Sequence, residues 1–448
     1  MSSDTVRLDS VQPRTRERGR SISVASTKAG ILFPLTVWVI HFLLTQIPAT
    51  LAYQFGTLRS FPNSGPESSA WQTPLRSLDG YANWIVEPFR HWDGTWYRWV
   101  AVDGYDPNHT ANAAFWPLYP WLMELGSAVT GWSVQTVGYL ISNVAFLGAL
   151  IVIYRLVSLD FSEPVARRTL WALALFPTAF FFTAIYTESL FLFLAASALF
   201  AARKGDWLLA GIVGFFAALT RSAGLMLLAP FAVLFIQQHG WNPRHWFPQA
   251  LPAVLPALGP VVFGWFLRSQ ELDFFDWADQ QWQWNRFSAT PWRTFDCLLQ
   301  GCTADVRSFG TTRQFDVRPI DWGWIGQALD NPNWTFITSS RFRYRVGESH
   351  VLELVVTVLA IALVLIGLRK LPLYFSAFVI PPLIVPLLTP SSVNPLMSMP
   401  RFVLPLFPLF VVVALLVKDR RLGVPLAVVS SLLLIVLTMQ FAQWYWVS

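Results

Sequence analysis

Charged residues are scarce in this sequence. Only 13% of its 448 residues are Asp, Glu, Lys or Arg, whereas a typical soluble domain contains roughly 25%. Hydrophobic residues make up 54% of the chain, and its mean hydropathy is +0.45. This composition excludes an ordinary soluble domain and predicts an all-α polytopic membrane protein.

Cysteine and histidine are scarce as well. The two cysteines, Cys297 and Cys302, do not form a zinc-ligand set, and the six histidines show no paired spacing. No glycine-rich phosphate loop follows a strand pattern, and no soluble basic domain accompanies the net charge of +6. The sequence therefore gives little support to metal, nucleotide or nucleic-acid binding. Cys297 and Cys302 could form a disulfide in an oxidising compartment, or remain two free thiols.

Apolar runs near the length of a bilayer crossing recur along most of the chain. Residues 1–29, which include four closely spaced arginines, are expected to form a disordered basic tail, and residues 30–448 a single transmembrane domain. No internal repeat is visible. We expect about eleven transmembrane helices, at residues 30–54, 134–157, 169–185, 187–203, 206–221, 223–239, 249–268, 351–368, 371–389, 402–417 and 423–443.

Lysines and arginines in the short connections indicate the orientation of the spans. With the N-terminal tail in the cytoplasm, two large segments, 55–133 and 269–350, fall outside together with most of the acidic residues. The cations that then fall inside are Lys28, Lys204, Lys370, Lys418, Arg155, Arg167, Arg168, Arg203, Arg369, Arg420 and Arg421.

Two arginines are exceptions to this distribution. Arg221 and Arg401 lie at the outer ends of predicted spans, where few cations are expected. Each either extends to the membrane surface or pairs with a neighbouring acid. Alternatively, one or both hold an anionic headgroup, because a guanidinium matches two phosphate oxygens at once.

The first outer segment contains an acid among aromatic residues. The periodicity of residues 91–105 predicts a short helix on the membrane surface, and residues 113–130 are expected to form a second interfacial or re-entrant helix. The first helix places two groups on neighbouring faces, Trp92, Trp96 and Trp99 on one and Asp93 and Tyr97 on the other. Asp93 is then either a general base at the membrane surface or only the cap of a helix.

The second outer segment, 269–350, is rich in tryptophan. Its indoles could stack on sugars in an acceptor site or a lid, or form the core of a small packed cap. Loops of this length without obvious elements are often functional. The tryptophans are Trp277, Trp282, Trp284, Trp292, Trp322, Trp324 and Trp334.

Several short motifs follow one another between residues 85 and 290. They are His91-Trp92-Asp93-Gly94-Thr95-Trp96-Tyr97 with Gly104-Tyr105, Phe115-Trp116-Pro117-Leu118-Tyr119-Pro120, Phe176-Pro177 with Tyr186-Thr187-Glu188-Ser189-Leu190-Phe191, and Thr220-Arg221-Ser222-Ala223-Gly224. Weaker matches are Gln281, Trp284, Arg286 and Pro400-Arg401. This ordered set resembles the PIG-V family, which comprises GPI mannosyltransferase 2 and its bacterial relatives. The stretch between Tyr105 and Phe115 departs from the eukaryotic pattern, so the resemblance is closer to the bacterial members.

The resemblance implies a glycosyltransferase of the GT-C type, which is multispanning, takes sugar from a polyprenyl phosphate and works on the extracytoplasmic face. Asp93 would be its essential acid, acting as general base in a single inverting displacement. Arg221 and Arg401 would bind the donor phosphate, with Arg286 as a third candidate. The residues expected to support the site or to contact substrate are His91, Trp92, Trp96, Tyr97, Tyr105, Tyr119, Glu188, Ser222, Gln281 and Trp284.

What is transferred follows from the same resemblance. The sugar is expected to be a hexose, mannose in the first place, moved to a lipid-linked or glycan hydroxyl in a bacterial plasma membrane rather than the endoplasmic reticulum. No residue is assigned as a metal ligand, although a divalent cation near Asp93 stays open, because some enzymes of this class use one. Glu188 is a second acid, a ligand for a sugar hydroxyl, or the fixed partner of Arg221.

Other functional classes stay open at this point. They are a lipid or sugar transporter or flippase, a non-catalytic assembly subunit, and a related lipid-phosphate-sugar enzyme with another sugar or a protein acceptor. A transporter is expected to show paired repeats and broken helices near the membrane midplane. Here the polar residues gather at the outer surface instead, which favours an interfacial enzyme.

Overall fold

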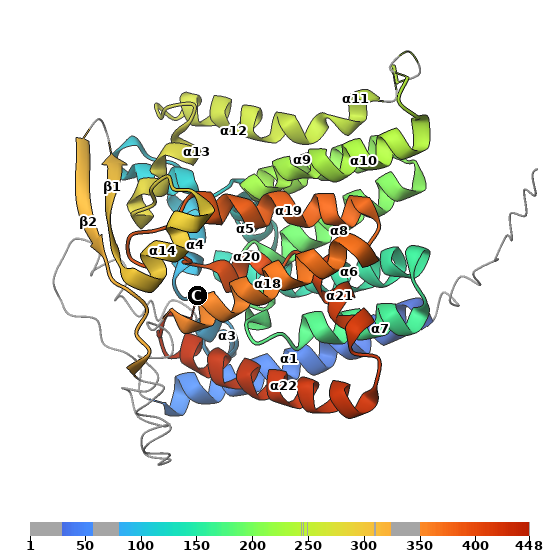
Figure 1. The fold of residues 1–448 in the computed structure, drawn as a ribbon. Coiled ribbons are helices and arrows are strands. Elements are labelled where there is room, and N and C mark those ends of the chain that lie inside the picture. Colours follow the sequence, from blue (N-terminus) through green and yellow to red (C-terminus); the bar gives the residue numbers. More distant parts are fainter. Residues whose placement is uncertain are drawn as a thin grey trace, which may run out of the picture.

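Apolar runs of bilayer length form the longest helices of the protein (Figure 1). The computed structural model describes residues 29–56, 80–242, 244, 246–248, 250–308, 311–323 and 350–447. Six helical segments in this part of the chain are long and apolar enough to cross a membrane. The protein is therefore a multi-pass membrane protein. The six segments are Gly30–Phe55, Val134–Asp160, Ser222–His239, Ala250–Ser269, Val351–Lys370 and Arg420–Ala442.

Most helices of the bundle coincide with predicted spans, although several are shorter than a bilayer crossing requires. The number of crossings, expected to be about eleven, therefore stays a prediction. The bundle comprises α1 (Ala29–Phe55), α6 (Val134–Asp160), α7 (Glu163–Ala174), α8 (Glu188–Lys204), α9 (Trp207–Thr220), η4 (Ser222–Leu227), α10 (Leu228–His239), α11 (Ala250–Ala253), η6 (Leu255–Ala257), α12 (Leu258–Ser269), α18 (Val351–Lys370), α19 (Leu373–Leu388), α20 (Met399–Val403), α21 (Phe407–Leu416) and α22 (Arg420–Ala442).

The expectation of one continuous helix over 169–185 is wrong. Helix α7 ends at Ala174, and a short 3-10 helix, η3 (Ala179–Phe182), and irregular backbone lead to the start of α8. Pro177 explains the break, because proline lacks an amide hydrogen and restricts the residue before it. Residues 178–190 are all buried in protein, which is the setting where irregular backbone is tolerated inside a membrane.

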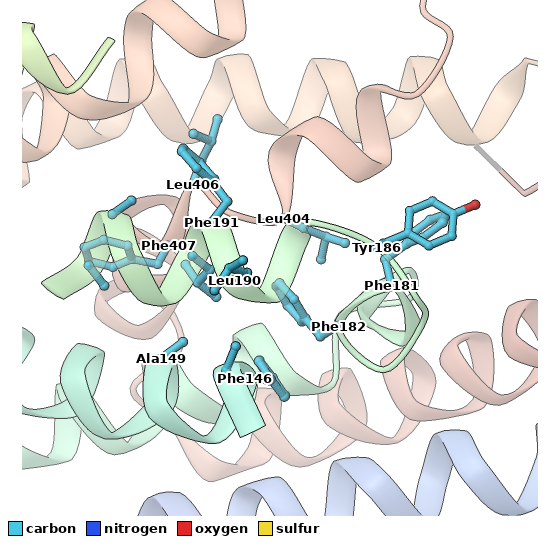
Figure 2. Close-up of a cluster of buried hydrophobic side chains, with 14 of the residues drawn as sticks. Phe146, Ala149, Phe181, Phe182, Tyr186, Leu190, Phe191, Leu404, Leu406 and Phe407 are labelled. Carbon is cyan, nitrogen blue, oxygen red and sulfur yellow. The ribbon is translucent and has the colours of Figure 1, made fainter. Parts of the chain in front are cut away.

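Helix α8 lies in the middle of the bundle, against α6 and α9. Figure 2 shows its residues Leu190 and Phe191 in an apolar cluster with Phe146 of α6 and with Leu404 and Leu406, which follow α20. Phe146 also stacks on Phe182 of η3, with ring centroids 4.4 Å apart. This packing holds the first turn of α8 in place, and Glu188 is the first residue of that turn.

A cap of short elements covers one end of the bundle, which we call the cap end (left in Figure 1). Helices lie where two were expected, at residues 91–105 and 113–130; they are α4 and α5, and their place at the membrane surface stays a prediction. The cap and its approach comprise α3 (Tyr81–Ile85), η1 (Glu87–Phe89), α4 (Asp93–Asp103), η2 (Pro107–Ala114), α5 (Leu118–Thr130), α13 (Asp276–Asp279), η7 (Gln280–Trp284), α14 (Pro291–Gln300), β1 (Cys302–Ser308) and β2 (Thr311–Val317).

The strands were not expected, and they qualify the all-α class by one antiparallel hairpin, β1 paired with β2. Alternate residues of β1, Ala304 and Val306, are buried in a small core of their own with Phe287 and Val317. Cys297 and Cys302 form a disulfide beside it. The second outer segment therefore contains a packed cap, but its core is mostly aliphatic rather than built from indoles. Two of its expected tryptophans, Trp324 and Trp334, lie outside the described residues.

The cap is joined to the bundle by main-chain hydrogen bonds. The amides of Phe287 and Ala289 donate to the carbonyls of Pro390 and Leu388, at 2.9 and 3.0 Å. In the other direction, the amide of Ser392 donates to the carbonyl of residue 285 at 2.9 Å. This strand-like pairing of 285–289 with 388–392 brings Arg286 to the bundle.

Candidate active site

Helix α4 brings Asp93 to the interior of the cap end. Asp93 is its first residue, where the helix dipole favours an acid, and Gly104, with φ of 76°, ends it. The Asp93 amide donates to the Tyr186 hydroxyl at 3.2 Å, and that hydroxyl donates to the carbonyl of His91 at 3.1 Å. Trp92, not Asp93, occupies the capping position, and no side chain caps the helix there. The carboxylate of Asp93 therefore does not cap helix α4.

Asp93 instead pairs with a residue 308 positions later in the chain. Arg401 Nη1 donates to Asp93 Oδ2 at 2.5 Å, and Arg401 Nε lies 3.0 Å from Glu188 Oε1. Arg221 Nη1 donates to the same Glu188 oxygen at 2.5 Å and to the Thr187 hydroxyl at 3.1 Å. Glu188 is fully buried, whereas the side chains of Asp93, Arg401 and Arg221 are 12%, 13% and 15% exposed. The fold thus joins Arg401 directly to Asp93, and Glu188 links Arg221 to Arg401.

A third arginine completes this cluster. Arg286 donates from Nη1 to the carbonyl of Thr389 at 2.8 Å. Its guanidinium carbon lies 5.7 Å from the centre of the Phe402 ring, and those of Arg221 and Arg401 lie 5.8 and 5.6 Å from the same centre. Burial, with a smaller contribution from the positive charge of Arg401, lowers the pKa of Arg286 to about 10, so it stays charged at neutral pH. Hereafter the charged cluster means Asp93, Glu188, Arg221, Arg286 and Arg401.

The charged cluster has an excess of positive charge, because it contains three guanidinium groups and only two carboxylates. Both carboxylates are already paired with arginine. A divalent cation would meet three like charges and would have to displace those pairs, so this donor set does not fit one. An anion with oxygen atoms, such as a phosphate, fits it well.

One comparison with known proteins, the match to a family model, is consistent with this chemistry. Residues 27–241 match the family model described as Mannosyltransferase (PIG-V). Over this region, just under half of its length, the chain is similar to the PIG-V family. Asp93, Glu188 and Arg221 all lie within the matched residues, whereas Arg286 and Arg401 lie beyond them. This similarity supports glycosyl transfer as the activity.

Other comparisons add less. No curated protein matches the chain. A crystal structure of ArnT from Cupriavidus metallidurans bound to undecaprenyl phosphate is similar to this chain, with a TM-score of 0.44 and 14% sequence identity. The similarity covers 90% of this chain and 63% of that one, so the chain spans less than two thirds of the length of ArnT.

His91 of the PIG-V motif is a fully buried residue that holds the loop before α4. Its Nδ1 donates to the carbonyl of Phe441 at 2.9 Å, and its ring stacks on Trp444 with centroids 3.9 Å apart. Burial lowers the pKa of His91 to about 3. The imidazole is therefore neutral and a weak base at physiological pH, which leaves Asp93 as the better candidate for a general base.

The aromatic residues of the motif mostly pack on one another. Trp92 contacts Trp444 and Trp446 edge to face, with centroids 5.9 and 5.0 Å apart. Trp96 stacks on both Trp99 and Phe115, at 5.4 and 5.5 Å. For Trp92 and Trp96, contact with substrate stays a prediction, and their observed partners are other rings.

The predicted tyrosines fall into two groups. The Tyr97 hydroxyl lies 3.1 Å from the Thr187 hydroxyl, which also accepts from Arg221. Burial raises the pKa of Tyr97, so its hydroxyl stays protonated. The hydroxyl of Tyr105 donates to the carbonyl of Phe115 at 2.6 Å, and that of Tyr119 to the carbonyl of Gly138 at 2.8 Å. Of the three tyrosines, only Tyr97 is therefore linked to the charged cluster, through the Thr187 hydroxyl.

The remaining predicted residues lie around the cluster. Ser222 directly follows Arg221 and is exposed. Trp284 lies 6.2 Å from Trp96, centroid to centroid, and its carbonyl accepts from Ser391 at 2.7 Å. Gln281 is half-buried in η7. Substrate contact by Ser222, Gln281 and Trp284 stays a prediction.

Sequence reasoning missed two residues of the site. Tyr186 belongs to one of the motifs, but the sequence does not predict its place beside Asp93. Its hydroxyl forms hydrogen bonds with the backbone of His91 and Asp93, and the centre of its ring lies 5.4 Å from the guanidinium carbon of Arg401. Figure 2 shows its hydroxyl pointing away from the other labelled side chains of the apolar cluster. Phe402, next to Arg401, was not singled out either. The only feature of the sequence that points to Phe402 is its position next to Arg401.

A separate hollow of about 270 Å³ lies beyond the far end of α4. It is lined mainly by polar side chains, and it does not include any residue of the charged cluster. Its lining residues are Pro107, Thr110, Arg268, Glu271, Leu272, Asp273 and Asp276.

Proposed function

We propose that this protein is a polyprenyl-phosphate-sugar-dependent glycosyltransferase that moves a hexose, with mannose as the expected sugar, to a hydroxyl of a lipid-linked or glycan acceptor. The charged cluster supports this proposal most directly. It combines one slightly exposed carboxylate, Asp93, with an excess guanidinium charge, and the reaction needs both a base and a phosphate site.

The chemistry assigns a task to each group. A polyprenyl phosphate is a leaving group that already carries charge and needs little protonation. Asp93 takes the proton of the acceptor hydroxyl while the oxygen of that hydroxyl forms a bond to the anomeric carbon. The bond from that carbon to the phosphate oxygen breaks, and its electron pair leaves with the phosphate. One displacement of this kind inverts the anomeric configuration and needs one carboxylate, unlike inverting hydrolysis, which needs two.

The arginines stabilise the charge that develops on the departing phosphate, a contribution that is often the largest in catalysis. Arg401 and Arg221 are held by Glu188, which is fully buried. Glu188 therefore serves better as their fixed partner than as a second base. Arg286 adds the third guanidinium from the cap side.

The side of the membrane is part of the proposal. Arg203 pairs with Asp160 at 2.7 Å, and Tyr374 donates to the same carboxylate at 2.6 Å. This joins the ends of α6, α8 and α19 that lie opposite the cap, close to the basic residues expected in the cytoplasm. The positive-inside rule then puts the cap end on the extracytoplasmic side. Location at one end of the bundle also favours an enzyme over a transporter, whose site is expected near the midplane.

The first prediction concerns Asp93 as general base. Replacing Asp93 by Asn should lower turnover at least about 100-fold, because general-base catalysis contributes roughly 10²- to 10⁴-fold. The measurement is transfer of labelled mannose from a polyprenyl-phosphate mannose to candidate acceptors, by protein purified in detergent. Parallel donors with glucose or arabinose identify the sugar.

Asp103→Asn is the matched control, since Asp103 is the exposed last residue of the same helix. It should retain wild-type turnover. If Asp93→Asn transferred sugar at the wild-type rate, Asp93 would not be the base. If no lipid-phosphate sugar served as donor for the wild type, the proposed activity itself would be wrong.

A further inference from the structure

One aromatic ring lies at the centre of the three arginines. Phe402 directly follows Arg401 in α20, and the guanidinium carbons of Arg221, Arg286 and Arg401 lie over its ring at 5.8, 5.7 and 5.6 Å from its centre. These distances fall within about 6 Å, the range in which a cation is attracted to the negative face of an aromatic ring. The three arginines come from different parts of the chain, and Phe402 is a contact that all three share.

The three cations need such a common contact, because like charges so close together repel one another. Glu188 pairs with Arg221 and Arg401, and Asp93 pairs with Arg401. Arg286 has no carboxylate partner among the described residues, and it donates a hydrogen bond to the neutral carbonyl of Thr389. The ring face is therefore the electron-rich group that Arg286 shares with the other two arginines.

We propose that Phe402 is a positioning residue of the phosphate site. Its ring gathers the three guanidinium groups and fixes the spacing at which they meet one phosphate. The inference rests on the proposed function, since it assigns Phe402 a role at the same anion site. It differs from a packing role, because it depends on the charge distribution of the ring and not only on its volume.

Substitutions can separate these two roles. Leucine fills similar apolar space but lacks the negative ring face, whereas tyrosine and tryptophan keep it. A single cation–π interaction corresponds to about a two- to fivefold change in an equilibrium constant. Because leucine removes all three of these interactions together, Phe402→Leu should weaken binding of a phosphate anion about tenfold, and Phe402→Tyr or Phe402→Trp should restore most of the affinity.

The experiment is a binding titration with the full-length protein in detergent micelles. The probes are a polyprenyl phosphate and the matched uncharged polyprenol, which share the lipid chain and differ in the anion. Phe200→Leu is the control variant, because Phe200 is also partly buried against the core but lies 5.9 Å from a single lysine, Lys204, at the opposite end. Thermal unfolding of each variant reports any general loss of packing.

The expected result is a loss of affinity for the polyprenyl phosphate alone in Phe402→Leu, with rescue by the aromatic variants. If the wild type prefers the phosphate but Phe402→Leu binds it equally well, the role of Phe402 is overturned and the proposed function stands. Equal losses for phosphate and polyprenol would reduce Phe402 to a packing residue. If the wild type shows no preference for the phosphate over the polyprenol, the anion site is wrong and the inference falls with it.

Discussion

Asp93 and Arg401 are bound to each other. The guanidinium that is proposed to bind the donor phosphate is hydrogen-bonded to the carboxylate that is proposed to act as base. A phosphate that binds Arg401 must therefore compete with Asp93 for the same donor groups. This competition also releases the carboxylate at the moment when it is needed to accept a proton.

This competition leads to a second prediction for Asp93→Asn. The neutral amide is a weaker partner for Arg401, and the variant cluster has one more uncompensated positive charge. Its affinity for a polyprenyl phosphate should therefore rise, by about three- to tenfold, even though turnover is lost. Equilibrium titration in detergent, beside the wild type and Asp103→Asn, measures the change. An unchanged or weaker affinity would show that Asp93 does not compete with the phosphate.

At this scale, the sequence could identify the charged residues but not their aromatic partners. Asp93, Arg221 and Arg401 are visible because charges are rare at the outer ends of apolar spans. Phe402 is one of 36 phenylalanines, and nothing in a linear pattern separates a ring that meets three arginines from a ring in the core. The contacts that distinguish it come from segments far apart in the chain.

At the scale of elements, the first turn of α8 holds the arginines of the site in place. The break after α7 and the buried backbone of residues 178–190 place Glu188 at the N-terminus of α8. The helix dipole favours an acid there, and the carboxylate binds both Arg221 and Arg401. The acid is therefore stabilised in a buried position by its helix and by two arginines from other elements.

Glu188 and Glu163 form a matched pair for a third prediction. Each is the first residue of a helix and pairs with an arginine, but Glu188 is fully buried and the Glu163 side chain is 43% exposed. Removing one partner of a buried pair typically costs about 3–5 kcal/mol, whereas an exposed pair contributes roughly 0.2–1 kcal/mol. Thermal unfolding should therefore show a large loss of stability for Glu188→Ala and a small one for Glu163→Ala. Similar small losses in both variants would show that Glu188 does not hold the arginines.

The positions of elements could be predicted better than their continuity. The spans at 30–54 and 134–157, and the helix at 91–105, follow from long or periodic apolar patterns, and the structure has helices there. The span at 169–185 was wrong because an apolar run does not reveal how its backbone is paired when a proline interrupts it. The hairpin of β1 and β2 was missed because its alternation of buried and exposed residues is short and lies in a polar segment.

At the scale of the whole molecule, the last helix closes the site around the first outer segment. Helix α22 packs along α1 (Figure 1), and the carbonyl of Phe441 accepts a hydrogen bond from His91, 350 residues earlier. Trp444 stacks on His91, and Trp446 contacts Trp92. The two residues before Asp93 are therefore held by the C-terminal end of α22 and the aromatic residues after it. No local pattern predicts this contact, because its partners are separated by most of the chain.

The last prediction follows from that closure. Trp444→Ala removes the ring that stacks on His91, so the turn before α4 loses its support and Asp93 no longer meets Arg401 in one fixed geometry. Catalysis is sensitive to such displacements, and turnover should fall at least about tenfold at temperatures well below unfolding. Trp207→Ala is the matched control, because Trp207 is similarly buried, at 5% exposure against 9%, but packs on Phe231 and Phe235 away from the site. Truncating a buried tryptophan costs about 3–5 kcal/mol, so both variants should unfold at lower temperature while only Trp444→Ala loses activity. If the two variants lost activity equally at matched distance from their unfolding temperatures, the C-terminal ring would contribute to stability alone and not to the placement of Asp93.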